Sequence, residues 1–141
     1  LVWLTVAEII KNTPFMVADR IIWKKNSALP NNVSPNKLTR IVEDVFIFVR
    51  KSEYRTFYCN KELTSVSRVG QQFYKPIYNF IEAPNNDGSC QLNKATFSSQ
   101  LVTELLDLYC PVGGLVYDPF MGTGTVAVGS FYVGGNYNEK R

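Results

Sequence analysis

The alternation of apolar and polar positions in the first half of the chain predicts one helix and two strands. Val2 to Ile10 carry apolar side chains at helical spacing, and a polar pair followed by proline ends that pattern. The β-branched and aromatic run at 20–24 predicts a strand. The run at 42–49 is apolar enough to predict a strand buried on both faces. The polar loop between them, rich in Asn, Ser and Pro, suggests that the two strands form an edge pair of a larger sheet.

In the second half, residues 52–92 lack a clear period, and the pattern returns after them. "FSSQLVTELLDLYC" predicts a helix that Ser98 or Ser99 can cap, with a stripe of leucines along one side. "LVYD", residues 115–118, predicts a short buried strand, and "GTVAVGSFYVGG" predicts a helix that ends at its glycine pair. Strands and helices in this order place the chain in the α/β class.

Composition narrows the range of functions. With 141 residues the chain has the size of one domain, and its net charge of +3 permits a polyanionic partner without requiring one. The chain has no histidine, no CxxC pair and only three cysteines, which argues against a metal site and against Ser-His or Cys-His catalysis. The three cysteines lie far apart and form no disulfide framework, so a reducing cytoplasm is the expected location. No apolar run is long enough for a membrane span, and no signal peptide is evident.

The clearest candidate for a ligand-binding site is "YDPFMGTGT", whose pattern predicts a strand end followed by a glycine turn and a helix. Glycines allow a ligand to approach the backbone, and a helix N-terminus offers free N–H groups. A nucleoside triphosphate would require a lysine after the glycines, and none follows them. A dinucleotide, S-adenosylmethionine, or a tight turn with no ligand all remain compatible with the pattern.

The segment "DPFMGTGT" resembles motif I, the DPFxGSGT signature of the amino-group DNA methyltransferases, which methylate adenine N6 or cytosine N4 with S-adenosylmethionine. Thr123 stands where serine is commoner. The preceding "NKATFSSQLVTELLDLYCPVGG" resembles motif X of the same family, with Asn93 in place of the frequent histidine and Ser98 in place of the frequent proline.

The resemblance implies S-adenosylmethionine as cofactor and a set of contacts from both motifs. For Thr96 and Ser98 helix capping is an equal alternative, and Phe97 is as well explained by core packing. The implied cofactor-binding residues are Lys94, Ala95, Thr96, Phe97, Ser98, Asp118, Pro119, Phe120, Gly122, Thr123, Gly124 and Thr125.

Upstream, residues 20–60 resemble the family segment "IIWxKxNxxPxxxxxRxxxxxEyIFxFxKS". Motif X before motif I is the β-class order, in which the catalytic half precedes the cofactor half. The implied fold is part of a Rossmann-like, S-adenosylmethionine-dependent methyltransferase sheet, incomplete in this chain. We expect residues 1–52 to be the end of the catalytic half, 53–92 to be a target-recognition or irregular insert, and 93–141 to be the cofactor-binding half.

The family's catalytic motif, (D/S/N)PP(Y/F), is absent, because the sequence has no Pro-Pro pair. In the β-class order it would precede Leu1, so no catalytic residue is assigned. We therefore expect the chain to be a stretch of a longer enzyme, inactive and marginally stable without its N-terminal half. An acidic residue for the cofactor ribose is also missing, with only Glu139 as a weak candidate.

Double-stranded DNA is the implied substrate, in a bacterial, phage or viral setting, with adenine N6 preferred to cytosine N4. The implied phosphate contacts, for which a solvated basic loop is an equal alternative, are Lys24, Lys25, Asn26, Lys37 and Arg40. Residue types that read bases also occur at Arg55, Arg68, Gln71, Gln72, Asn85 and Asn86, although a plain surface loop explains them more readily. The rival hypotheses are an RNA or protein methyltransferase, an inactive remnant or half-enzyme that needs a partner chain, and a dinucleotide oxidoreductase.

Overall fold

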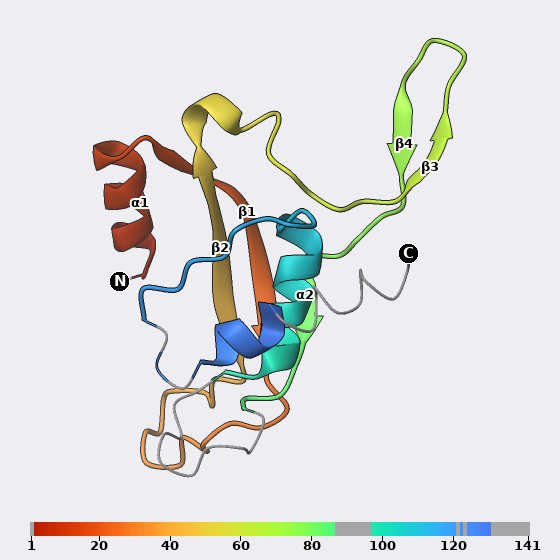
Figure 1. Cartoon of the computed structure of the whole chain (residues 1–141). Helices are drawn as coiled ribbons and strands as arrows, with labels where there is room; N and C mark the ends of the chain where they lie inside the picture. Colours follow the sequence, from red (N-terminus) through yellow and green to blue (C-terminus); the bar gives the residue numbers. More distant parts are fainter. Residues whose placement is uncertain (1, 87–96, 121, 123, 131–141) are drawn as a thin grey trace.

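The computed structural model describes residues 2–86, 97–120, 122 and 124–130. Its helices are α1 (Val2–Asn12) and α2 (Ser99–Tyr109), with a short 3-10 helix η1 (Lys51–Glu53) and a further helical stretch at residues 125–130. Its strands are β1 (Phe15–Lys24), β2 (Val42–Arg50), β3 (Leu63–Val66), β4 (Gln72–Tyr74) and β5 (Phe80–Glu82). Figure 1 shows their arrangement. None of the described helices is long and apolar enough to cross a bilayer.

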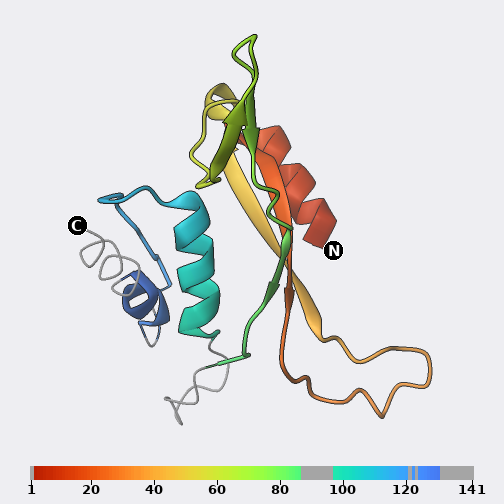
Figure 2. The same ribbon diagram turned by 90° about the vertical axis from the view of Figure 1, so that its right-hand side faces the viewer.

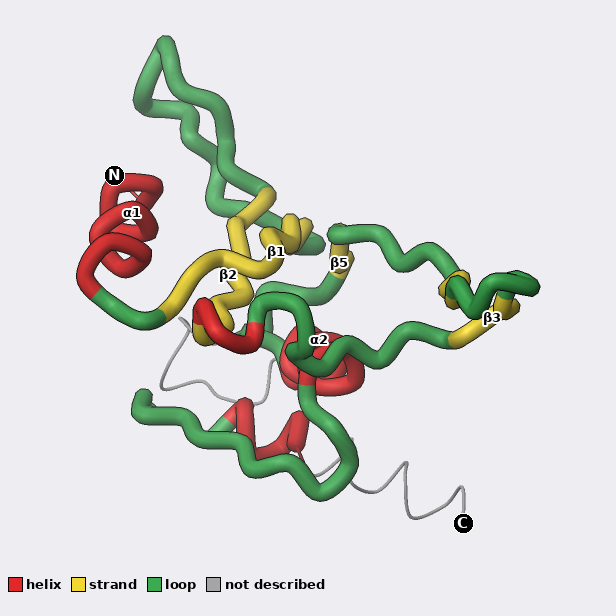
Figure 3. Tube along the Cα trace, turned by 90° about the horizontal axis from the view of Figure 1, so that it is seen from above, coloured by secondary structure: helices red, strands yellow, loops and turns green. Residues whose placement is uncertain are grey.

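The main sheet has three strands in the order β2-β1-β5. β1 runs antiparallel to β2 along its whole length, from Phe15 opposite Arg50 to Lys24 opposite Val42, and parallel to β5. Seen along the strands in Figure 3, the three lie side by side with α2 beneath them. The predicted neighbours at 20–24 and 42–49 are thus confirmed as a pair, but β1 begins five residues earlier than predicted and is internal because β5 pairs with its second edge.

The two helices cover opposite faces of this sheet, which gives three α/β/α layers and confirms the α/β class (Figure 2). The core between sheet and α2 consists of Ile21, Trp23, Ile81, Ala83 and Leu101. Each buried aliphatic side chain of this kind contributes about 1.5–3 kcal/mol through removal of apolar surface from water. On the other face the α1 ring of Trp3 packs edge-on against Phe46 of β2, with ring centroids 5.1 Å apart.

The predicted helices at the N-terminus and after Ser98 are confirmed as α1 and α2, and each is fixed at one end by a side chain. The helix predicted after the glycine turn is confirmed over residues 125–130, and the rest of it lies outside the described residues. The Lys51 ammonium donates to the carbonyls of Ile10 and Thr13, at 2.8 and 3.0 Å, where the last carbonyls of α1 lack partners within the helix. The Ser98 Oγ accepts from the amide of Leu101 at 3.3 Å and so caps the N-terminus of α2. Ser98 is fully buried, so this cap also orients α2 on the sheet.

The prediction that the 42–49 strand is buried on both faces is wrong. The first three residues of β2 are exposed and the next five are only half-buried. The reason is its position: within the described residues β2 pairs with β1 alone, so its second edge faces solvent. An apolar run indicates burial on both faces only where neighbouring strands and covering helices are present.

The prediction of a buried strand at 115–118 is also wrong, because these residues form no strand. Leu115 is 96% exposed and Tyr117 83% exposed. A parallel strand exists only by hydrogen bonding to neighbours, and no strand of the described part of the chain lies beside this segment. Residues 111–114, which precede this segment, form a turn that is closed by the hydrogen bond from the Gly114 amide to the Pro111 carbonyl, at 2.8 Å.

Three short strands occupy the range 52–92, for which the sequence pattern gave no prediction. β3 and β4 form a separate antiparallel hairpin that projects away from the main sheet (Figures 1 and 2). β5 returns to the main sheet and pairs with the last three residues of β1. Strands of three or four residues are too short to display an alternating pattern.

Candidate functional site

The glycine turn is built by one side chain and two special backbone conformations. The carboxylate of Asp118 accepts a hydrogen bond from the Phe120 amide at 2.9 Å, which folds the chain back directly after the extended segment. Gly122 and Gly124 follow with φ of +52° and +82°, a region that other residues rarely adopt. The chain then enters the helical stretch 125–130, whose first described turn closes with a hydrogen bond from the Val128 amide to the Gly124 carbonyl, at 3.1 Å.

A cavity of about 400 Å³ lies beside this turn. Its volume falls in the range of pockets that hold small molecules. The walls are mostly small or apolar, with one carboxylate to fix a polar ligand group. They consist of Gly114, Val116, Asp118, Val126, Ala127 and Ser130.

The helical stretch after the turn is packed closely on α2. A Cβ atom added to Gly129 would lie 2.6 Å from Cγ1 of Val102, closer than real Cβ contacts allow. The absence of a side chain at residue 129 therefore lets the two helices touch. Because α2 packs on the sheet, the glycine turn is held in a fixed position relative to the sheet as well.

The structure describes only part of the predicted cofactor set. Lys94, Ala95, Thr96 and Thr123 lie outside the described residues. Phe97 is partly exposed next to the start of α2, whereas the hydroxyl of Ser98 is buried in the helix cap. Pro119 and Phe120 are exposed at the turn, and Thr125 is half-buried where the helical stretch begins.

Three of the five predicted DNA contacts line a second cavity, one forms a surface ion pair, and one accepts a hydrogen bond. This cavity, also about 400 Å³, is lined by three of the five predicted residues, and its lining is Lys25, Ala28, Leu29, Asn31, Lys37, Leu38, Arg40 and Asn85. Lys24 instead pairs with Glu82 at 2.8 Å, and the Asn26 side chain accepts from the backbone amide of Asn85 at 3.3 Å. The 25–41 loop thus gathers Lys25, Lys37 and Arg40 on one surface.

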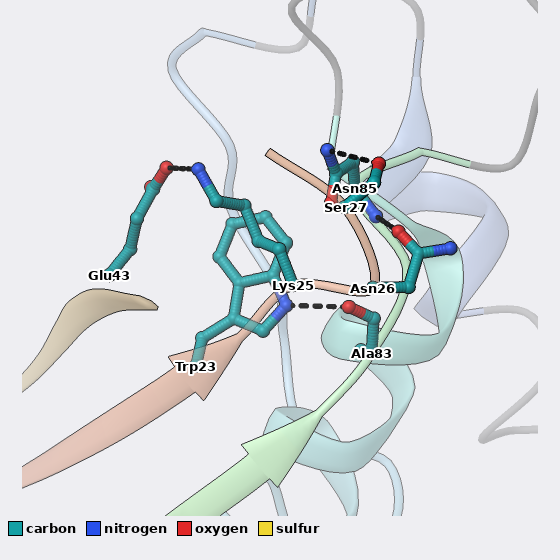
Figure 4. A network of polar contacts seen from close by, with 7 residues as sticks. All are labelled: Trp23, Lys25, Asn26, Ser27, Glu43, Ala83 and Asn85. Atoms are coloured by element: carbon teal, nitrogen blue, oxygen red, sulfur yellow. Dashed lines mark hydrogen bonds and ion pairs between the residues drawn. The ribbon is translucent and has the colours of Figure 1, made fainter. Parts of the chain in front are cut away.

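The cations of this loop differ in how far their charge is already balanced. The Lys25 ammonium pairs with Glu43 at 2.7 Å, as Figure 4 shows. Among the described residues, Lys37 and Arg40 form no ion pair and both are exposed. An exposed pair adds little to stability, but its partner reduces the charge that an anion would meet. Lys37 and Arg40 are therefore the cations best able to meet a phosphate.

A third, smaller cavity of about 80 Å³ lies on the α2 side of the sheet and contains several titratable groups. The phenol of Tyr109 lies 3.4 Å from the Asp19 carboxylate, and burial together with that carboxylate raises the pKa of Tyr109 to about 12. Burial also raises the pKa of the Cys59 thiol, opposed by the charge of Lys61. Both groups are therefore protonated at neutral pH. Within the described residues, no cluster of three or more Cys, Asp or Glu side chains could hold a metal ion.

Sequence reasoning missed the role of Trp23. Its indole N–H donates to the carbonyl of Ala83 at 2.9 Å and joins the ends of β1 and β5 (Figure 4). The only signal in the sequence is a tryptophan near the end of a strand, which does not identify a partner 60 residues away.

The protein has three α/β/α layers, with a glycine turn and a helix packed on α2. This arrangement defines a Rossmann-like ligand-binding protein. The family model described as DNA methylase, for N6 and N4 methyltransferases, matches residues 2–137. The chain therefore belongs to the DNA methylase family.

Individual relatives agree with this family in sequence and in fold. The Type II methyltransferase M.MjaI of Methanocaldococcus jannaschii is 24% identical over 121 residues, an alignment that covers 79% of this chain and 40% of the relative. The crystal structure of M1.HpyAVI superimposes with a TM-score of 0.65 at 20% identity, covering 94% of this chain and 56% of that one. The cytosine-N4-specific PvuII DNA methyltransferase gives 0.67 at 18% identity, covering 92% and 48%. The chain thus spans 40% to 56% of the length of these proteins.

Proposed function

We propose that the chain is the cofactor-binding part, and part of the DNA-binding surface, of an enzyme that transfers a methyl group from S-adenosylmethionine to an exocyclic amine of DNA. The observation that carries this proposal is the glycine turn, with its two left-handed glycines, the Asp118 carboxylate and the adjoining cavity, in a chain of the DNA methylase family. One of its structural relatives is the crystal structure of M1.HpyAVI in complex with S-adenosylmethionine.

The residues of the turn fit such a cofactor. Gly122 and Gly124 leave the backbone open to close approach, and the Asp118 carboxylate can accept hydrogen bonds from an amine or a hydroxyl. S-adenosylmethionine, when bound, supplies the electrophilic methyl group. The chain's own contribution is to bind and orient it, through Phe97, Asp118, Pro119, Phe120, Gly122, Gly124 and Thr125, together with Lys94, Ala95, Thr96, Ser98 and Thr123 of the predicted set.

The residues that hold the target amine have to come from outside these 141 residues, since the sequence lacks (D/S/N)PP(Y/F). In the part of the chain that the structure describes, β2 has no neighbour on its second edge. This supports the proposal, because a further segment or partner chain can extend the sheet there. Adenine N6 is the proposed acceptor and cytosine N4 the second candidate. A methyltransferase base has to leave the duplex to reach such a site.

Calorimetric titration of the chain with S-adenosylmethionine tests the proposal, with NAD as the matched control. Binding of the first alone is the expected result, and binding of NAD alone would contradict it. Methyl transfer by the enzyme completed with its catalytic segment then identifies the base, when it is measured on duplexes of A·T pairs and on duplexes of inosine·C pairs, in which inosine removes the guanine amine. Transfer to RNA but not to DNA would favour the RNA methyltransferase alternative.

The 25–41 loop and the last residue of β1 are proposed to contact DNA phosphates. The proposed contacts are Lys24, Lys25, Asn26, Lys37 and Arg40. Lys37→Ala and Arg40→Ala are each expected to weaken duplex binding at low salt. Because each contact releases about one counterion, each variant should lower the slope of log K against log salt by about 1. Fluorescence anisotropy over a range of salt concentrations measures both quantities.

Lys11→Ala is the matched control because it removes the same charge at the far end of β1. That strand is 10 residues long, which at about 3.3 Å per residue places the start of β1 roughly 30 Å from the loop. Equal losses in all three variants would mean that net charge, rather than this loop, binds DNA.

The β3–β4 hairpin is proposed to be the target-recognition element of the 53–92 range. It projects from the sheet, and apolar and aromatic residues on it are exposed, among them Val69, Phe73 and Tyr74. A two-stranded ribbon of this kind fits the major groove of DNA.

A further inference from the structure

The chain segments that follow β1 and β5 meet at one edge of the sheet. These strands are parallel, and their last residues, Lys24 and Glu82, lie opposite each other. Beyond them the Asn85 amide donates to Asn26 at 3.3 Å, and the Asn85 Nδ2 donates to the Ser27 hydroxyl at 3.3 Å (Figure 4). In open α/β sheets this carboxyl edge of parallel strands is where ligands bind.

One polar atom in this cluster lacks a partner. The Oδ1 of Asn85 is buried, and it is the only buried side-chain oxygen or nitrogen of the described residues without a hydrogen bond. Buried acceptors are nearly always paired, because leaving one unpaired costs free energy. The Asn85 backbone amide and one N–H of its Nδ2 already donate. Oδ1 is a carbonyl oxygen and can only accept, so its missing partner is a donor.

The cavity that Asn85 lines has the chemistry of a nucleotide site. Leu29 and Leu38 are 93% and 89% exposed, so apolar surface is available for the flat face of a base. Lys37 and Arg40, which form no ion pair with any residue that the structure describes, line the same cavity and can meet a phosphate. An asparagine amide is a common reader of the amino-bearing edge of a base.

We infer that Asn85 is a base-reading residue: its Oδ1 accepts a hydrogen bond from the exocyclic amine of one nucleotide, whose phosphate is met by Lys37 or Arg40. This inference rests on the proposed function, since it takes DNA to be the ligand. It adds one base contact, made by the segment after β5, to the target recognition proposed for the β3–β4 hairpin.

Short single-stranded oligonucleotides test the inference: oligo-dA and oligo-dC carry an exocyclic amine, and oligo-dT carries none. The wild-type chain is expected to bind oligo-dA or oligo-dC more tightly than Asn85→Ala does, by about three- to tenfold, which is typical of one hydrogen bond. Affinity for oligo-dT should be the same in both proteins. Fluorescence anisotropy with labelled oligonucleotides gives these ratios.

Asn31→Ala is the matched control, because Asn31 lines the same cavity but its side-chain oxygen already accepts from the Ser34 amide at 3.4 Å. It should leave the ratio between bases unchanged. Should Asn85→Ala fold poorly by circular dichroism, Asn85→Asp provides the second arm. That variant keeps the acceptor, so it should retain the preference for amino-bearing bases at lower overall affinity.

The experiment distinguishes a failure of the proposed DNA-binding function from a failure of the Asn85 inference alone. If the wild-type chain binds none of the oligonucleotides, the proposed DNA-binding function and this inference both fail. If it binds all three and Asn85→Ala has the same base ratio as the wild type, the inference alone is overturned, and a water molecule is the simplest partner for Oδ1. A loss of preference in Asn85→Asp equal to that in Asn85→Ala would also overturn it.

Discussion

Replacing Gly124 with alanine is expected to weaken S-adenosylmethionine binding by roughly 5- to 150-fold. Gly124 has a φ of +82°, and a Cβ there would meet no atom within 4 Å, so the cost comes from backbone strain rather than from a clash. Strain of this kind amounts to about 1–3 kcal/mol, and each 1.4 kcal/mol changes an equilibrium tenfold. The turn would relax to a different conformation and no longer present its backbone to the cofactor. Isothermal titration calorimetry of the chain measures the change.

Gly70 offers a matched control within the same chain. It also has a φ of +82° and open space around its Cβ position, but it lies at the tip of the β3–β4 hairpin. Gly70→Ala therefore introduces the same strain without touching the glycine turn, and cofactor affinity should be unchanged. If both variants bind S-adenosylmethionine equally weakly, the effect comes from general destabilisation and the glycine turn is not the cofactor site.

Trp23→Ala is expected to lower the free energy of unfolding by about 3–5 kcal/mol, a large share of the stability of a small domain. Trp23 is a member of the buried core and its indole N–H pairs with the Ala83 carbonyl. The substitution leaves a cavity and an unpaired carbonyl at the junction of β1 and β5. Denaturant unfolding followed by far-UV circular dichroism measures the loss.

Trp3→Ala is the matched control, because it makes the same substitution at a tryptophan that is 56% exposed on α1. Its ring contacts Phe46, and the Arg20 guanidinium lies 5.4 Å from its centroid. An aromatic pair contributes about 0.5–1.5 kcal/mol beyond burial, and an exposed cation–π contact about 0.5–1 kcal/mol. The loss should thus be clearly smaller than for Trp23. Equal losses would mean that the β1–β5 junction is no more important to the fold than the packing of α1.

Elements whose stability is local could be predicted from sequence, and those that depend on distant partners could not. α1 and α2 are 11 residues long each, with a period that their own side chains display. The 115–118 segment has an equally clear apolar pattern, but a strand needs a neighbour, and none lies beside it in the described residues. β5, with three residues, is the reverse case: it has no pattern of its own and exists because β1 provides an edge.

The candidate site shows the same division. The two glycines with positive φ and the Asp118 turn follow from a short continuous motif. Lys24 and Lys25 were predicted as phosphate contacts, and the structure pairs them with Glu82 and Glu43, the first of them 58 residues away. Ion pairs between residues this far apart depend on which strands become neighbours. The orphan acceptor of Asn85 is likewise visible only once β1 and β5 lie side by side.

The close contact at Gly129 has a thermodynamic consequence for the whole of the proposed cofactor-binding part. The helical stretch after the turn touches Val102 of α2, and α2 packs on the sheet through Leu101. A ligand that binds only the ordered turn stabilises every element that has to be folded for the turn to exist. The free energy of unfolding of α2 would then rise with the concentration of the cofactor. The protein would be most stable when the cofactor is bound.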